Sequence, residues 1–272
     1  MRGKISSMTN VKIKQAAGLQ NRKKREKEGL FVAEGIRLAE MAVESSWNMV
    51  YALYMSDMEK QPRGRALLER LEHDGCPLYE VPEPVYRKAS GTDTPQGILL
   101  VMEQQRYSLS ELPVREAPLY VILDGVQDPG NAGTIIRTAD AAGADAVIFL
   151  CGTVDVFGEK AVRSSMGSLF HIPVCMDVAA EDLLAFSAQR NVELLSAALD
   201  QNARPYWERD FRPGCAIVFG NEGSGVSDSL LARTDHLYIP MYGRAESLNV
   251  GASASILLYE AIRQRRYSSQ QQ

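Results

Sequence analysis

The feature that most constrains the fold is a set of short runs in the second half of the chain that are apolar at every position. Leu119–Leu123, Ala146–Leu150 and Ala216–Phe219 show no alternation with polar residues. Strands of this kind are buried on both faces, which is typical of a parallel sheet covered by helices. The other elements expected in this half are strands over residues 192–197 and 236–240, and helices over residues 134–142 and from Asn249 onward.

A weaker alternation of strands and helices occupies the first half. The pattern predicts strands over residues 30–33, 48–55 and 97–102, and helices over residues 35–46 and 64–73. The stretch that follows is polar, contains Pro113, and shows little periodicity, as is typical of a linker. We therefore expect an α/β protein with two domains, residues 1–103 and 118–272, joined by a linker over residues 104–117.

Charge is distributed unevenly along the 272 residues. The net charge is −4, yet residues 1–30 hold nine Lys or Arg against two Glu and carry +7, so the remainder carries −11. A basic segment on an acidic body suits contact with a phosphate backbone. A solvated, partly disordered arm would have the same composition, and charge alone does not distinguish the two.

Several classes of protein are excluded by what the sequence lacks. No apolar run approaches the roughly 20 residues that span a bilayer. The first ten residues lack the apolar core of a secretory signal peptide. The four cysteines lie far apart and the three histidines are scattered, so neither a metal site nor a disulfide framework is expected. A reducing cytoplasm is the default location.

Three polar, glycine-rich segments follow expected strands. They are Asp124–Ala139, Gly220–Gly225 and Ile239–Asn249. Because ligands bind beyond the carboxyl ends of parallel strands, these segments indicate a ligand crevice. Neither a phosphate-binding Gly-Lys-Ser/Thr triplet nor a correctly spaced G-x-G-x-x-G is present, so a nucleoside triphosphatase or a dehydrogenase is disfavoured.

Taken singly, the polar residues of these segments have ordinary structural explanations. Asn131 and Asn249 lie where helix caps would lie, Arg137 is compatible with a surface arginine, and Glu222 with a loop carboxylate. It is the occurrence of all three segments at one edge of a sheet that favours a binding site.

At these residues the chain resembles the SpoU/TrmH family of S-adenosylmethionine-dependent RNA ribose 2′-O-methyltransferases, within the SPOUT superfamily. The first half resembles the substrate-binding domain of many members, which is similar to a ribosomal-protein fold that binds RNA. The matching segments are Asp128-Pro-Gly-Asn131-Ala-Gly-Thr-Ile-Ile-Arg137-Thr-Ala, Val218-Phe-Gly220-Asn-Glu222-Gly-Ser-Gly225, Ile239-Pro-Met241-x-Gly243-x-x-x-Ser247-Leu248-Asn249 and, in the first half, Phe31-Val-Ala-Glu-Gly-Ile-Arg-Leu.

The resemblance implies a parallel-sheet SPOUT domain with a trefoil knot, a homodimer, and S-adenosylmethionine as methyl donor without a metal. The implied cofactor pocket and catalytic residues overlap. The pocket comprises Gly220, Glu222, Ile239, Met241, Leu248 and Asn249, and the catalytic residues are Arg137, Asn131, Glu222, Ser247 and Asn249.

The reaction implied is attack by a ribose 2′-oxygen on a methyl carbon. Attack builds negative charge on oxygen, which the permanently charged, planar guanidinium of Arg137 is suited to stabilise. An ordinary pKa above about 12 argues against this side chain as the base. Asn131, Ser247 and Asn249 would orient the ribose and Arg137, and Glu222 would fix the loop geometry.

Ribosomal RNA is the expected substrate, because the separate N-terminal domain is unlike the short helical extensions of members that act on tRNA. Three alternatives remain open: a tRNA 2′-O-methyltransferase, a relative that methylates a base, and a non-catalytic RNA-binding or ribosome-assembly protein with a vestigial pocket. The presence of Arg137, Glu222, Ser247 and Asn249 together argues against the last.

Overall fold

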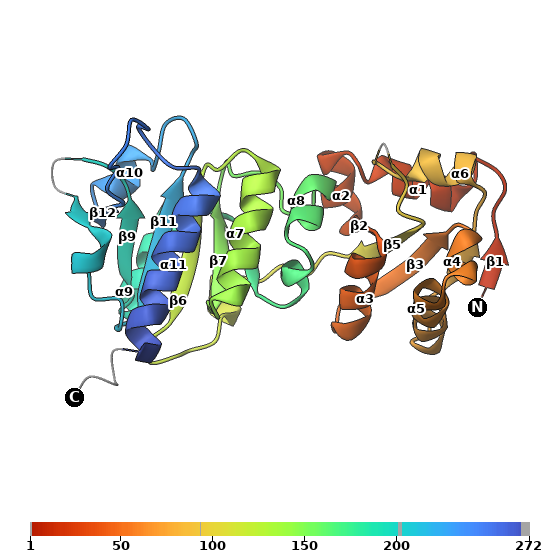
Figure 1. Cartoon of the computed structure of the whole chain (residues 1–272), viewed down its shortest axis with the longest axis horizontal. Helices are drawn as coiled ribbons and strands as arrows, with labels where there is room; N and C mark the ends of the chain where they lie inside the picture. The colour runs from red at the N-terminus through yellow and green to blue at the C-terminus, as the bar shows by residue number, and fades with distance from the viewer. Residues whose placement is uncertain (1, 93, 201–202, 268–272) are drawn as a thin grey trace. The chain divides into compact units, whose positions relative to one another are not determined.

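The computed structural model describes residues 2–92, 94–200 and 203–267. The chain forms two compact units. The first comprises residues 1–105 together with 155–171, and the second comprises residues 106–154 together with 172–272. Figure 1 labels most of the helices and strands named below.

The first unit contains a five-stranded mixed sheet in the order β1-β4-β3-β5-β2. Strands β1, β4 and β3 run parallel, whereas β5 runs antiparallel to both β3 and β2. Its elements are β1 (Arg2–Lys4), α1 (Val11–Gly18), α2 (Arg22–Glu28), β2 (Leu30–Glu34), α3 (Ile36–Glu44), β3 (Met49–Tyr54), α4 (Asp57–Lys60), α5 (Pro62–His73), β4 (Leu78–Glu80), α6 (Glu83–Ala89), β5 (Ile98–Glu103), α8 (Glu159–Ser164) and the 3₁₀ turn η2 (Ser168–Phe170).

The basic segment at the start of the chain is folded, so it is not an extended arm. The side chains of Asn10 and Asn21 cap α1 and α2 by accepting hydrogen bonds from backbone N–H groups two residues ahead. Arg25 is buried, and its Nε and Nη2 donate to Asp155 Oδ2 at 2.9 and 2.8 Å. Its Nη1 donates to the backbone oxygens of Leu19 and Gln20. This ion pair joins the segment 155–171 to the first unit.

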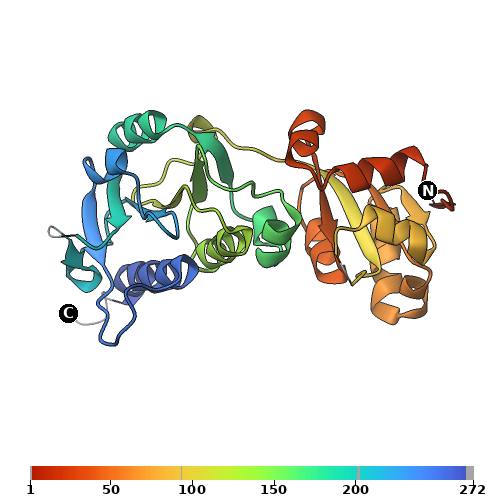
Figure 2. The same ribbon diagram turned by 90° about the horizontal axis from the view of Figure 1, so that it is seen from above.

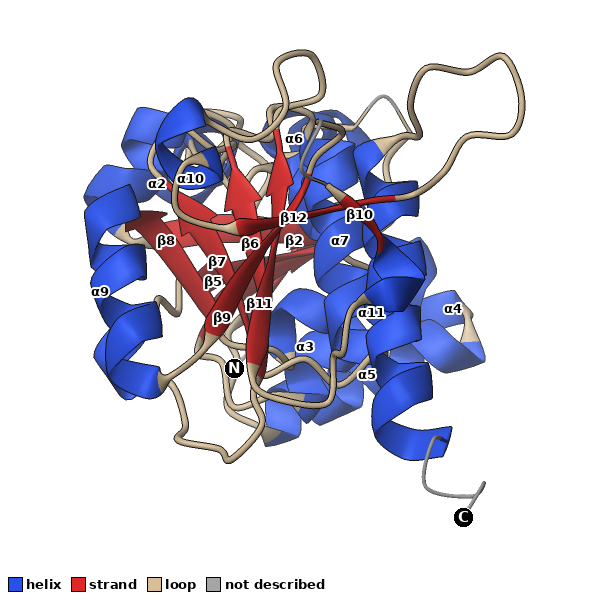
Figure 3. Cartoon of the chain, turned by 90° about the vertical axis from the view of Figure 1, so that its left-hand side faces the viewer, coloured by secondary structure: helices blue, strands red, loops and turns tan. Residues whose placement is uncertain are grey.

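The second unit contains a seven-stranded sheet in the order β10-β12-β9-β11-β6-β7-β8, and every paired neighbour is parallel. Helices α7 and α11 cover one face and α9 covers the other (Figures 2 and 3). Its elements are η1 (Leu109–Glu111), β6 (Leu119–Asp124), α7 (Pro129–Ala141), β7 (Ala146–Leu150), β8 (Val174–Val178), α9 (Ala180–Arg190), β9 (Glu193–Ala197), β10 (Arg204–Pro205), η3 (Tyr206–Glu208), β11 (Cys215–Gly220), α10 (Asp228–Leu231), β12 (Asp235–Tyr238) and α11 (Val250–Tyr267).

The continuous apolar runs form the centre of this sheet, as predicted. All residues of β7 and β11 are buried, and β6 is buried up to its final Asp124. The covering helices on both faces explain why no polar residue interrupts these runs. The α/β fold with a parallel-sheet domain predicted from the sequence is therefore confirmed.

The sequence prediction for the second unit omitted β8, α9, β10 and α10, and it placed the start of α7 too late. Strand β8 was missed because Asp177 interrupts its apolar pattern, and this residue adopts a left-handed φ of 54°. Helix α7 begins at Pro129, one turn before the expected start near Thr134. Among the described residues, no helix is both long and apolar enough to cross a membrane.

Candidate active site

A cavity of about 920 Å³ lies at the carboxyl ends of β9, β11 and β12. This volume is at the upper end of the range typical of small-molecule sites. Its lining combines apolar side chains from the strands with polar loop residues, and it includes all six residues expected around a cofactor. The residues that line it include Leu199, Phe219, Gly220, Glu222, Leu237, Ile239, Met241, Ser247, Leu248, Asn249 and Leu257.

The loop after β11 folds into a closed turn. Asn221 and Gly225 exchange backbone hydrogen bonds at 2.9 Å in both directions. The Asn221 side chain accepts from the N–H groups of Gly223 and Ser224 and donates to the Gly125 carbonyl, which attaches the turn to the end of β6. A Cβ on Gly220 would overlap the backbone of Gly225, so only glycine permits this turn.

Glu222 lies where two of the glycine-rich segments meet. Its carboxylate accepts hydrogen bonds from the backbone N–H groups of Gln127 at 3.0 Å and Asp128 at 3.1 Å, and from Asn131 Nδ2 at 2.9 Å. Partial desolvation raises the pKa of Glu222, but these donors outweigh it and hold the pKa below its ordinary value. Glu222 is therefore an ionised acceptor that holds the start of α7.

Asn131 is not the cap of α7. Asp128 caps the helix instead, because its side chain accepts from the Asn131 N–H at 2.9 Å and Pro129 occupies the first helical position. The Asn131 side chain is thereby released to donate to Glu222 and to accept from Asn249 Nδ2 at 2.9 Å. Asn249 does cap α11, since its Oδ1 accepts from the N–H of Gly251 at 2.9 Å.

The third glycine-rich segment contributes the rim of the cavity. Ser247 and Leu248 line the cavity and are exposed, with Leu248 37% accessible. Because Asn249 joins Asn131, the start of α11 is held beside the start of α7. The structure therefore brings together four of the five residues expected to be catalytic: Asn131, Glu222, Ser247 and Asn249.

Arg137 is placed differently from the other four. It is exposed on α7 and is not among the residues that line the cavity. No residue in the described part of the chain forms a hydrogen bond or ion pair with it. At about 100° per residue, the six residue steps from Asn131 to Arg137 place the two side chains about 120° apart around the helix. The arginine is thus available to a ligand or to another chain.

Sequence reasoning missed two contributors to the site. The backbone N–H groups of Gln127 and Asp128 hold Glu222, and the carboxylate of Asp124 accepts from the Ser227 N–H at 2.7 Å. The Asp128-Pro129 pair is a recognisable helix-start signal. No local pattern, in contrast, indicates that Asp124 would join the end of β6 to the start of α10.

A parallel sheet with three polar, glycine-rich segments joined by hydrogen bonds beside one cavity is the arrangement expected of a SPOUT-type methyltransferase domain. Residues 118–259 match the SpoU rRNA Methylase family, and residues 10–100 match the MRM3-like substrate binding domain. The chain therefore belongs to the SpoU rRNA methylase family.

Its relatives cover nearly the whole chain. It is 40% identical to the 23S rRNA (guanosine(2553)-2′-O)-methyltransferase RlmP of Bacillus subtilis, over 94% of this chain and 97% of that one. It is 32% identical to the 23S rRNA (uridine(2479)-2′-O)-methyltransferase of Streptomyces viridochromogenes, over 94% and 91%. The AdoMet-bound rRNA methyltransferase from Sinorhizobium meliloti superposes with a TM-score of 0.87 at 32% identity, covering 96% of this chain and 98% of that one.

Proposed function

We propose that the protein methylates the 2′-oxygen of a ribose in ribosomal RNA, with S-adenosylmethionine as methyl donor. The observation that carries this proposal is the hydrogen-bonded set Glu222, Asn131 and Asn249, which joins three loops around one cavity. The relatives described above support both the reaction and ribosomal RNA as substrate.

The cavity suits the donor. The exposed apolar side chains of Leu199 and Leu248 can cover an adenine ring, while backbone groups of the loops at Gly220 and Met241 can hydrogen-bond its polar edge. When bound, S-adenosylmethionine supplies an already activated methyl group. No group of three or more potential metal ligands occurs in the described part of the chain, and the proposed chemistry uses none.

The protein's own residues then position the ribose and manage charge. Asn131 and Asn249 hold each other in a fixed orientation at the cavity edge, where amide groups can hydrogen-bond ribose hydroxyls. Arg137 stabilises the negative charge that develops on the attacking oxygen, as an unpartnered, permanently charged guanidinium can. Ser247 orients the ribose from the opposite loop.

A homodimer would explain the placement of Arg137. The exposed side of the paired helices α7 and α11 carries Arg137 and the aromatic ring of Tyr259, which is 53% exposed. Association through this face would bring Arg137 and a second chain together beside the active site. The trefoil knot stays a prediction from the family.

We assign RNA binding to the domain of residues 1–103 and catalysis to residues 118–272, with residues 104–117 as linker. The basic helices α1 and α2 supply the positive charge that RNA requires. Cys76, Cys151, Cys175 and Cys215 are all free thiols, in keeping with the cytoplasm as the proposed location.

The choice of RNA is tested by incubating the protein with S-adenosylmethionine labelled in the methyl group and with separated 23S rRNA, 16S rRNA and tRNA. We expect label in 23S rRNA. Label in tRNA alone would retain the chemistry and overturn the substrate. Binding of the donor without transfer to any RNA, including RNA from partly assembled ribosomal subunits, would favour a non-catalytic assembly protein.

A further inference from the structure

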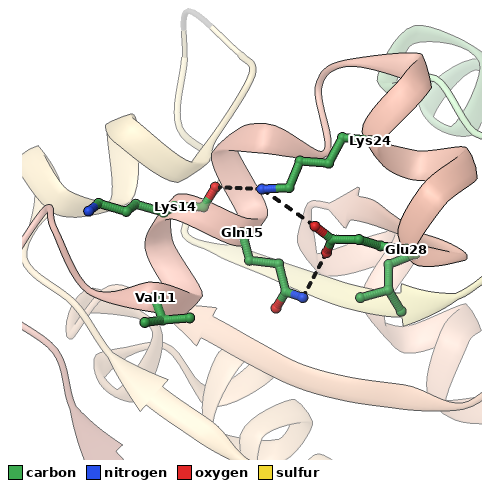
Figure 4. A pocket seen from close by; sticks show the side chains of 6 residues that line it. Val11, Lys14, Gln15, Lys24 and Glu28 are labelled. Atoms are coloured by element: carbon green, nitrogen blue, oxygen red, sulfur yellow. Dashed lines mark hydrogen bonds and ion pairs between the residues drawn. The ribbon is translucent and has the colours of Figure 1, made fainter.

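A shallow groove of about 420 Å³ lies between α1 and α2, away from the cavity described above. Figure 4 shows the side chains that line it. We propose that this groove holds one unpaired RNA nucleotide and prefers a base that carries an exocyclic amino group. The proposal rests on the proposed function in taking RNA as the partner. The lining residues are Val11, Lys14, Gln15, Lys24, Glu28 and Leu30.

The rim of the groove is positively charged. Lys14 is exposed and has no hydrogen-bond or ion-pair partner for its ammonium group among the described residues. Lys23 and Lys27 are exposed on the neighbouring α2. Since the first 30 residues carry +7, this rim attracts a phosphate group, and a free ammonium group can contact it directly.

The interior of the groove presents acceptors in a fixed arrangement. Gln15 Nε2 donates to Glu28 Oε2 at 2.8 Å, and Lys24 Nζ lies 3.6 Å from Glu28 Oε1 (Figure 4). Lys24 also donates to the backbone oxygen of Lys14 at 3.3 Å. The long contact to Lys24 leaves Glu28 Oε1 able to accept a shorter hydrogen bond, and Gln15 contributes its amide oxygen.

The position of Lys24 depends on a glycine in α1. A Cβ on Gly18 would overlap the end of the Lys24 side chain, so this side chain lies directly on the helix backbone. Lys24 thereby stays beside Glu28 rather than extending into solvent. The side chains of this pair are 34% and 26% exposed, so both are partly shielded from solvent.

Apolar surface completes the groove. Val11, which is 79% exposed, supplies the accessible apolar surface of the groove, whereas Leu30 is largely buried at 9% exposure. The groove can contact each part of a nucleotide. Its aliphatic surface can pack against the base, its carboxylate can accept from the N–H groups of the base, and the ammonium group at its rim can contact the phosphate. A carboxylate-bearing peptide fits less well, because Glu28 would repel its charged group.

The groove should distinguish two pyrimidine bases of the same size, cytosine and uracil. Cytosine carries an amino group where uracil carries a carbonyl oxygen, and a Glu carboxylate accepts hydrogen bonds from that amino group. We expect the full-length protein to bind single-stranded oligocytidylate about fivefold more tightly than oligouridylate of equal length. Fluorescence anisotropy with labelled oligonucleotides at low salt measures both dissociation constants.

Matched variants test whether Glu28 is responsible for the preference for cytosine. Glu28→Gln should reduce the ratio of the two dissociation constants to below about twofold, whereas Glu26→Gln, an exposed residue of the same helix outside the groove, should leave it unchanged. Gln15→Ala should also reduce the ratio and provides a second variant if Glu28→Gln unfolds. Lys14→Ala should weaken binding of both oligonucleotides equally and lower the salt slope by about 0.7.

Equal affinity of the unmodified protein for both oligonucleotides, or an equal effect of Glu26→Gln and Glu28→Gln, would overturn the inference. Methyl transfer to ribosomal RNA is assayed separately. If transfer occurs and the groove variants do not alter the base preference, the groove assignment fails and the proposed function stands. If no methyl transfer occurs but the Glu28→Gln variant loses the base preference, the groove assignment stands and the proposed function fails.

Discussion

The side-chain amide of Asn249 donates a hydrogen bond to the amide oxygen of Asn131 at 2.9 Å, although 118 residues separate them. Asn131 in turn donates to Glu222 at 2.9 Å. Asn131 lies in the first turn of α7, Glu222 in the loop after β11 and Asn249 directly before α11, so these two hydrogen bonds fix the relative positions of three segments beside the cavity. The geometry of this edge of the cavity therefore depends on contacts between side chains more than on any one segment.

Asn131→Ala should uncouple the three loops. Two hydrogen bonds are lost, which should cost about 1 kcal/mol each in the free energy of unfolding. Because orientation contributes strongly to rate, we expect the rate of methyl transfer to fall at least about tenfold. Steady-state kinetics and thermal unfolding measure both effects. An unchanged rate in a correctly folded variant would show that this residue does not orient the reactants.

Arg137→Ala should separate activity from stability. Arg137 has no partner among the described residues, so its removal should leave the melting temperature of the separated chain unchanged. Loss of charge stabilisation should lower kcat by about 10² to 10³. Arg137→Lys keeps the charge and loses the planar fork, and it should retain only part of the activity. Full activity of the lysine variant would contradict the role given to the guanidinium.

Glu222 should confer a pH-dependent stability on the cavity loops. Its pKa is lowered from 4.5 in the folded state, so its contribution is fully present above that value and is lost as the pH falls through the lower folded value. The stability difference between the unmodified protein and Glu222→Gln should shrink as the pH falls from about 6 to about 3. Urea unfolding at several pH values in this range measures the difference in free energy of unfolding between the two proteins. A difference that does not change with pH would show that protonation of Glu222 does not affect stability.

Gly220→Ala should abolish binding of S-adenosylmethionine, because the added Cβ overlaps the backbone of Gly225 and Val226 and forces the turn open. Gly223→Ala in the same loop is the matched control, since its added Cβ would come no closer than 3.5 Å to a neighbouring atom. Isothermal titration calorimetry measures the affinity of each variant for S-adenosylmethionine. Equal affinities in both variants would show that the closed turn is not required.

The buried ion pair of the first unit should contribute to stability. Asp155→Asn leaves the Arg25 guanidinium buried without a charged partner, and we expect a loss of about 3 kcal/mol in the free energy of unfolding. Asp57→Asn removes an exposed pair with Lys60 and should change this quantity by less than about 0.5 kcal/mol. Chemical denaturation of the two variants and the unmodified protein measures the loss in free energy of unfolding that each substitution causes.

The sequence predicted the centre of the second unit well. Continuous apolar runs identify strands buried on both faces, so β6, β7 and β11 were found nearly to the residue. All six residues predicted to surround the donor line one cavity, because they lie at or beyond the ends of β11 and β12, at the same edge of the sheet.

Other features depend on contacts that no local pattern encodes. Arg25 lies in a run of exposed basic residues, yet its pairing with Asp155, 130 residues away, buries it. Asn131 has the composition of a helix cap, but Asp128 occupies that position and gives Asn131 another role. Composition could likewise not distinguish a disordered basic arm from the two helices, α1 and α2, that form it.

Methylation of a ribose 2′-oxygen is tested by locating the transferred methyl group in the RNA. Ribosomal RNA labelled by the protein is digested with alkali, which cleaves only linkages with a free 2′-hydroxyl. We expect label in a single alkali-resistant dinucleotide, absent when Arg137→Ala replaces the unmodified protein. Label released entirely in mononucleotides would place the methyl group on a base and exclude 2′-O-methylation.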